Sequence, residues 1–114
     1  ANSIAELSVQ AKALVREHHL PALVLTCGEQ GVLAVTARET YLAVSPVQKV
    51  VNAAGAGDAI SGVLPWRLSL GYSWSEALRW SAAAGAAVVL TEGTAQCRVE
   101  DFQRILAATK TRAF

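Results

Sequence analysis

Residues 52–59 read Asn52-Ala53-Ala54-Gly55-Ala56-Gly57-Asp58-Ala59, and they separate an apolar extended segment from a long helical pattern. Two glycines one small residue apart, just ahead of a helix, let backbone N–H groups point together at the positive end of the helix dipole. Such a loop can hold a phosphoryl group during its transfer. We expect positive φ at Gly57 and a place for Asp58 in the first helical turn, where its carboxylate can accept a proton from an attacking hydroxyl.

The loop residues by themselves leave a structural alternative open. The glycines can simply supply positive φ for a tight turn, with Asp58 capping the helix. Two phosphate motifs are excluded by inspection. A dinucleotide fingerprint needs a third glycine where Ile60 stands, and a Walker loop needs a Lys-Ser/Thr pair where Asp58 and Ala59 stand.

Upstream of the loop, the sequence predicts one helix and three strands. Residues 3–6 have capping-box spacing and open a helical apolar period, so we expect a helix over 4–18. Two apolar runs, 23–26 and 32–36, flank a glycine-containing turn and predict a β-hairpin. A further strand is expected at 41–44.

Downstream of the loop, the pattern is wholly helical. The first helix should end at Gly71, which is placed as a C-terminal cap. A second capping box opens an alanine-rich helix over residues 73–91. The last helix is expected over 99–109, with Lys110 and Arg112 complementing its negative C-terminal end.

Composition limits the class of protein. The 114 residues are 53% hydrophobic and 17% charged, with 10 Lys+Arg against 9 Asp+Glu, which fits one globular domain and argues against a nucleic-acid partner. The longest apolar run, 82–90, is too short to cross a membrane, so we expect a soluble, cytoplasmic protein with no membrane partner. Cys27 and Cys97 form no metal-ligand pattern, and adjacent His18 and His19 make a poor pair, so no metal site is expected. Reduced thiols are the default for the cysteines, and a disulfide is left open.

Residues 52–59 resemble the signature near the C-terminus of the ribokinase, or PfkB, family of carbohydrate kinases. The family's Thr-x-Gly, with a second glycine soon after, is matched by Thr26, Gly28 and Gly31, and its capped helix of small residues by 73–89. The resemblance covers nearly the whole chain in the family's order. It implies an α/β class, namely the C-terminal part of a ribokinase-like three-layer α/β/α fold with a mostly parallel sheet.

The resemblance also implies roles by position. Asp58 matches the catalytic base, and Gly55, Ala56 and Gly57 match the anion hole around the transferred phosphate. The residues implied to lie against the nucleotide are small, and they are Thr26, Gly28, Gly31, Ala82 and Gly85. For these five, an ordinary strand-end turn or plain helix packing is the competing explanation.

The sequence departs from the family in three ways. Asn52 stands where the signature usually opens with Asp, as in several phosphosugar and pseudouridine kinases of the family, and this weakens the case for a monovalent cation beside the loop. Ala82 lies where many members offer adenine a polar side chain. Family kinases are more than twice as long, and their Asn-x-x-Glu motif associated with magnesium is not found before Thr26. We therefore expect residues 1–114 to be the C-terminal nucleotide-binding and catalytic part of a kinase domain, inactive without the N-terminal half.

The resemblance implies ATP-dependent phosphotransfer to a hydroxyl of a sugar, sugar phosphate or nucleoside. ATP and Mg2+ are the implied cofactors, with the magnesium ligands outside this chain. The implied partners are the small-molecule sugar or nucleoside and the missing N-terminal half or a partner chain, and a homodimer is left open. The alternative is a noncatalytic nucleotide-binding or dimerisation fragment of the same fold.

Overall fold

The structure, a computed structural model, describes residues 3–46, 55–90 and 98–114. Along the chain its elements are α1 (Ile4–Glu17), β1 (Leu23–Thr26), a 3-10 turn η1 (Gly28–Gln30), β2 (Val32–Val35), β3 (Thr40–Val44), α2 (Ala56–Ser69), α3 (Trp74–Val88), α4 (Val99–Ala108) and β4 (Lys110–Ala113). The first helix, the hairpin and the third strand lie within one residue of the bounds that the sequence predicts.

The four strands form one sheet in the order β1-β2-β3-β4, and every pairing is antiparallel. The expectation of a mostly parallel sheet is therefore wrong for the described part of the chain. Parallel neighbours need a crossover of a dozen residues or more, whereas short turns join β1 to β2 and β2 to β3. β4 comes back from the far end of the chain, and it too runs antiparallel, with Thr111 opposite Ala43.

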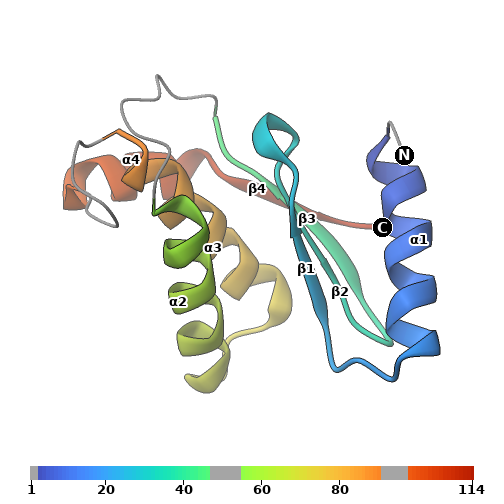
Figure 1. The fold of residues 1–114 in the computed structure, drawn as a ribbon. Coiled ribbons are helices and arrows are strands. Elements are labelled where there is room, and N and C mark those ends of the chain that lie inside the picture. The colour runs from blue at the N-terminus through green and yellow to red at the C-terminus, as the bar shows by residue number, and fades with distance from the viewer. Residues whose placement is uncertain (1–2, 47–54, 91–97) are drawn as a thin grey trace.

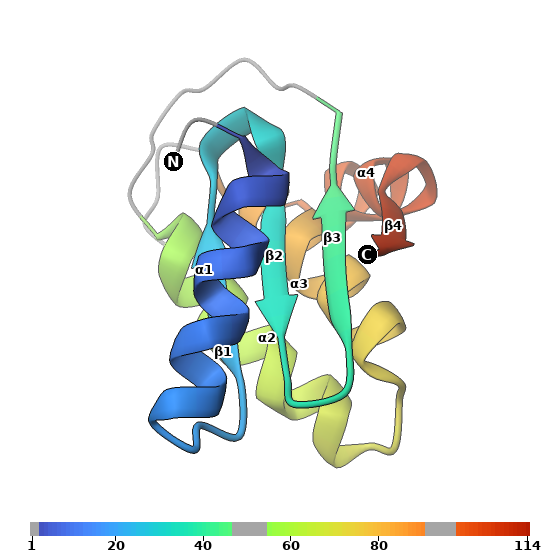
Figure 2. The same ribbon diagram turned by 90° about the vertical axis from the view of Figure 1, so that its right-hand side faces the viewer.

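Helices cover both faces of the sheet (Figures 1 and 2). α1 packs on one face through Ala11 and Val15, which meet Leu33, Val35 and Leu42. α2 and α3 cover the other face, where the buried cluster comprises Val32, Ala34, Ala43, Ile60, Leu64, Ala77, Leu78 and Ala82. Because side chains alternate along a strand and both faces are covered, every residue of β2 is buried. This arrangement confirms the three-layer α/β/α architecture.

Local signals in the sequence fix most helix ends. The Ser3 hydroxyl accepts a hydrogen bond from the Glu6 N–H at 3.1 Å, and Ser73 does the same for Glu76 at 3.2 Å. Each such cap contributes about 1 kcal/mol to helix stability. Gly71 follows the end of α2 with φ of +90°, as expected of a glycine after a helix. α3 ends at Val88, earlier than the alanine-rich pattern predicts.

The C-terminal residues form a strand where the sequence predicted a helix end. Lys110 and Arg112 lie in β4 instead of in the last turn of α4. A run of Lys, Thr, Arg and Ala carries little strand signal of its own. The strand forms because the open edge of β3 offers backbone partners, and this pairing continues to the Phe114 N–H, which donates to the Thr40 carbonyl at 2.9 Å.

Arg67 joins α2 to α3. Only 7% of the residue is exposed, and its guanidinium carbon lies 3.7 Å from the centre of the Tyr72 ring and 3.8 Å from that of Trp80. Glu76 lies nearby and forms an ion pair with Arg79 at 2.7 Å. The hydrogen bond from Arg79 holds the pKa of Glu76 below its usual value. Stacked aromatic rings and paired charges therefore close the end of the α2–α3 layer that lies away from the glycine loop.

Candidate active site

A cavity of about 400 Å3 lies where the β1–β2 loop, the end of β3, the start of α2 and the middle of α3 meet. We call it the glycine pocket. It is lined by Thr26, Gly28, Glu29, Gly31, Val32, Ala43, Ser45, Pro46, Ala56, Gly57, Ile60, Ala82, Gly85, Ala86 and Val89. The volume is that of a small-molecule site, and the small residues leave backbone atoms accessible on its walls.

Two glycines shape the β1–β2 side of the glycine pocket. Gly31 has φ of +116° and ψ of −162°, a conformation that only glycine adopts readily. A Cβ added there would overlap the Ala43 carbonyl oxygen of β3. Gly28 has φ of +58° and open space around it. Backbone bonds close the turn, with the Cys27 N–H donating to the Gly31 carbonyl at 2.8 Å. Gly31 is therefore required by the fold whatever the pocket holds.

The start of α2 presents backbone donors that no described residue pairs. Gly55 is the N-cap with φ of +91°, and the Ala59 N–H makes the first bond of the helix, to the Gly55 carbonyl at 2.9 Å. The N–H groups of Ala56, Gly57 and Asp58 therefore have no acceptor within the helix. With the positive end of the dipole, they form an anion-binding arrangement at the wall of the glycine pocket.

The structure corrects two details of this loop. The expected positive φ at Gly57 is wrong, since the residue is helical and the left-handed position belongs to Gly55. Asp58 does not cap the helix, because Gly55 holds the cap position and no side chain caps α2. The structural alternative of a turn glycine plus a capping aspartate thus does not describe Gly57 or Asp58.

Asp58 is exposed in the first turn of α2, two residues after Ala56. No described residue donates a hydrogen bond to its carboxylate. Neither Asp58 nor Gly55 lines the glycine pocket, although both adjoin residues that do. Asp58 therefore lies beside the glycine pocket without forming part of its wall.

α3 forms the back wall of the glycine pocket. Ala82 is buried and packs against Ile60 and Leu64 of α2 within the same apolar cluster. A Cβ added at Gly85 would meet two Ile60 side-chain carbons at 3.0 Å and the Ala56 carbonyl oxygen at 3.4 Å. Gly85 therefore lets the first turns of α2 approach α3 closely, whatever its relation to a ligand.

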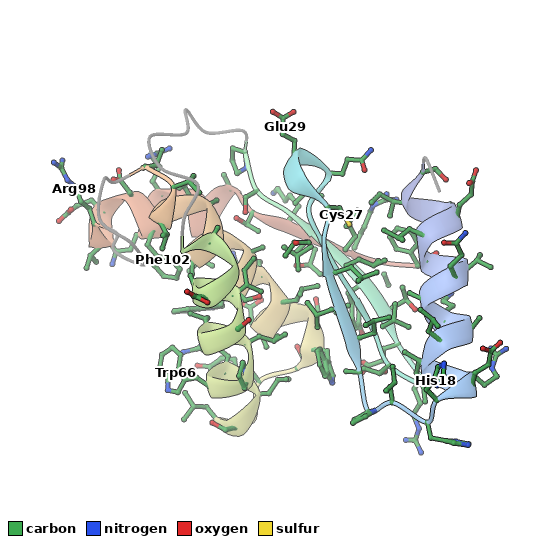
Figure 3. All side chains as sticks on the ribbon, in the orientation of Figure 1. His18, Cys27, Glu29, Trp66, Arg98 and Phe102 are labelled. Atoms are coloured by element: carbon green, nitrogen blue, oxygen red, sulfur yellow. The ribbon has the colours of Figure 1, made fainter. Side chains whose placement is uncertain are left out.

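The glycine pocket thus brings together seven of the residues that the sequence singled out: Thr26, Gly28, Gly31, Ala56, Gly57, Ala82 and Gly85. Asn52 lies outside the described residues. Glu29 is a lining residue that the sequence did not indicate, and Figure 3 shows its side chain pointing outward from the tip of the β1–β2 loop. Glu29 lies between Gly28 and Gly31, which the sequence did place at the site, and this position could have indicated it as a lining residue. Ser45 and Ile60 also line the pocket, but they carried no such signal.

Metal ligands are not gathered here. Among residues 3–46, 55–90 and 98–114, no group of three His, Cys, Asp or Glu lies close enough to hold a metal ion. The site offers two carboxylates, Glu29 and Asp58, one on the loop and one on the helix. A protein-held Mg2+ does not fit this set, so the expectation that its ligands lie elsewhere stays a prediction.

In the same described ranges, no helix combines the length and hydropathy needed to cross a bilayer.

Known proteins are similar to this chain in both sequence and fold. Residues 1–101 match the pfkB family carbohydrate kinase. The chain is 35% identical to the ATP-dependent 6-phosphofructokinase isozyme 2 of Mycobacterium tuberculosis, over 93% of this chain and 34% of that protein. It therefore spans about a third of the length of that curated relative.

Two solved structures superpose closely on it. Phosphofructokinase-2 from Escherichia coli, in complex with potassium, has a TM-score of 0.82 at 30% identity, over 93% of this chain and 34% of that one. Ribokinase from Thermotoga maritima has a TM-score of 0.75 at 26% identity, over 89% and 34%. Taken with the family match over residues 1–101, these likenesses show that the chain belongs to the pfkB family of carbohydrate kinases and has their ribokinase-like α/β fold.

Proposed function

We propose that this chain is the nucleotide-binding and catalytic-base part of a longer kinase that transfers phosphate from ATP to a hydroxyl of a sugar phosphate. One observation carries the proposal: a single pocket joins the Thr26-x-Gly28 loop to the free N–H groups that open α2. Family membership and the name of the Mycobacterium relative support ATP as the donor and a sugar phosphate as the acceptor. They favour a sugar phosphate over the pseudouridine suggested by Asn52.

In the proposed reaction, the triphosphate lies along the β1–β2 loop with its terminal phosphate at the start of α2. The N–H groups of Ala56 and Gly57 would stabilise the charge on the transferred phosphoryl group, because preorganised donors need no reorientation as the charge develops. Asp58 would take the proton of the attacking hydroxyl. The acceptor pocket and the magnesium ligands are assigned to the missing N-terminal half or to a partner chain.

Replacing Asp58 by Asn tests the assignment in the full-length kinase that contains this chain. The amide keeps the size of the side chain but is not basic, so kcat should fall by roughly 100-fold or more while ATP affinity stays nearly constant. Steady-state kinetics and calorimetric titration with ATP measure the two effects. Asp101→Asn, on α4 away from the glycine pocket, is the matched control and should keep normal turnover.

Near-normal turnover of Asp58→Asn would remove this residue as the base. A wild-type protein that binds ATP but turns over no sugar or sugar phosphate would favour the noncatalytic nucleotide-binding alternative.

A further inference from the structure

A second cavity, of about 430 Å3, lies on the opposite side of the sheet from the glycine pocket. It is bounded by α1, the β2–β3 turn, the start of β3 and Phe114. α1 lies over β1 and β2 and leaves β3 beside it, as Figure 2 shows. Three cationic residues line this cavity, Lys12 and Arg16 one turn apart on α1 and Arg38 on the turn. We call it the basic pocket.

Glu39 is the one acidic residue among the described residues that line the basic pocket, and its carboxylate is bonded to a side chain on the other face of the sheet. Glu39 accepts a hydrogen bond from the Tyr41 hydroxyl at 2.9 Å, and this bond raises the pKa of Tyr41. Tyr41 packs against the cluster under α2 and α3, on the other face of the sheet. Glu39 directly precedes β3, and its hydrogen bond to Tyr41 draws its carboxylate toward that face. Among the described residues that line the basic pocket, the three cations are therefore accompanied by one acidic side chain, and that side chain is engaged with Tyr41.

Within residues 3–46, 55–90 and 98–114, these three cations also have no ion-pair partner. The ion pairs among the described residues are Glu76 with Arg79 and Asp101 with Arg104, both on other helices. The chain has 10 Lys+Arg against 9 Asp+Glu, so a general excess of basic residues does not explain why three cations gather around one cavity. Holding like charges together is unfavourable unless an anion offsets them.

The turn that carries Arg38 is built rigidly. The Thr36 hydroxyl oxygen accepts hydrogen bonds from the Arg38 N–H at 3.2 Å and the Glu39 N–H at 3.0 Å. The Thr36 N–H donates to the Glu39 carbonyl at 2.8 Å, which closes the turn. Thr40 is buried below it and adds a hydroxyl to the lining. Arg38 is therefore presented from a fixed backbone, opposite two cations on a helix.

We propose that the basic pocket binds a small molecule carrying two or more linked phosphate groups. The cavity is larger than one phosphate needs, and its charges come from two separate elements, which suits an extended polyanion. Arginine and lysine recognise phosphate oxygens through charge-assisted hydrogen bonds, and Thr40 adds a neutral hydroxyl to the lining. The site lies across the sheet from the glycine pocket, so the inference does not rest on the proposed kinase reaction.

Lys12 provides a local readout of this binding. Its amine can be acylated by an N-hydroxysuccinimide ester with and without inorganic pyrophosphate at constant ionic strength, and the modified lysines quantified by mass spectrometry. Pyrophosphate should slow labelling of Lys12 by roughly fivefold or more, because a bound anion both covers the amine and stabilises its protonated form. Lys110, at the other end of β3, should be labelled equally in both samples.

Matched variants assign the protection to the site. The double variant Arg16→Gln and Arg38→Gln should lose most of the Lys12 protection. Arg98→Gln and Arg104→Gln, which remove the same charge at the N-cap and in the middle of α4, should keep it. All four arginines are exposed, so these variants should fold, and circular dichroism checks this. Unchanged labelling of Lys12 by pyrophosphate would overturn the proposal. So would equal protection of Lys110, or protection that persists in the Arg16/Arg38 variant.

Discussion

Gly31 is the residue whose identity the fold constrains most tightly. Gly31→Ala should lower the free energy of unfolding by about 3 kcal/mol, since a strained backbone conformation adds to overlap with the Ala43 carbonyl. Gly28→Ala is the matched control on the same loop. It should cost only about 1 kcal/mol, because its φ is left-handed but nothing crowds the new methyl group. Urea denaturation of both variants measures the difference, and equal costs would contradict it.

Gly57 is expected to matter for nucleotide binding and not for stability. Its backbone is helical and a Cβ there meets open space, so Gly57→Val should change the free energy of unfolding by less than about 1 kcal/mol. The same side chain would project from a residue that lines the glycine pocket, so ATP affinity should fall by roughly tenfold or more. Thermal unfolding and calorimetric titration give the two values. Unchanged ATP binding would mean that the start of α2 does not contact the nucleotide.

At the scale of elements, the contact between α2 and α3 depends on a glycine. Gly85→Ala should destabilise the protein by about 1 kcal/mol, because the methyl group comes within 3.0 Å of buried Ile60 and outweighs the better helix propensity of alanine. Gly62→Ala, in the exposed middle of α2, has no such neighbour and should stabilise by about 0.5 kcal/mol.

The Gly85 effect can be traced to one side chain. Adding Ile60→Val should restore part of the stability lost in Gly85→Ala, which a double-mutant cycle in urea would detect as a coupling between the two residues. If Gly85→Ala instead stabilises the protein, α3 moves to admit the methyl group.

The elements also show what a sequence of this kind can and cannot predict. Capping boxes at Ser3 and Ser73, and the apolar runs on both sides of Gly31, identify their helices and hairpin from neighbouring residues alone. β4 cannot be predicted in this way, because it forms by pairing with β3 and its own side chains carry little strand preference. The parallel sheet was inferred from the fold of a whole family, whereas every pairing between the described strands is antiparallel.

The candidate site follows the same division. The residues of the loop and of the helix start can be predicted to gather, since glycines with fixed spacing dictate backbone shape. Which glycine takes positive φ depends on where the first turn of α2 begins, and Gly55 takes it in place of Gly57. Glu29 and the basic pocket depend on which elements meet across the sheet, and no local pattern encodes that.

The whole molecule leaves apolar surface uncovered. Val9 is 66% exposed on α1, and Trp66, Leu70 and Tyr72 are 50%, 55% and 43% exposed around the end of α2. If the chain is one part of a longer kinase, the isolated 114 residues should bind a hydrophobic dye, self-associate or unfold with low cooperativity. Fluorescence titration, light scattering and calorimetry test these properties.

The full-length protein is the control for that prediction. It should bury these surfaces and lose the dye binding. An isolated chain that is monomeric, binds no dye and melts in one sharp transition would mean that it is a self-sufficient domain.

The pairing of β4 with β3 has a consequence for the order in which the protein is built. On the ribosome, β1, β2 and β3 emerge together and can form their hairpins at once, because their partners are close in sequence. β4 is made after these strands and must find β3 across all of α2, α3 and α4. Until then, the edge of β3 is open to other strands. Docking of β4 therefore covers the β3 edge, and nascent chains stalled before Lys110 should be captured by chaperones.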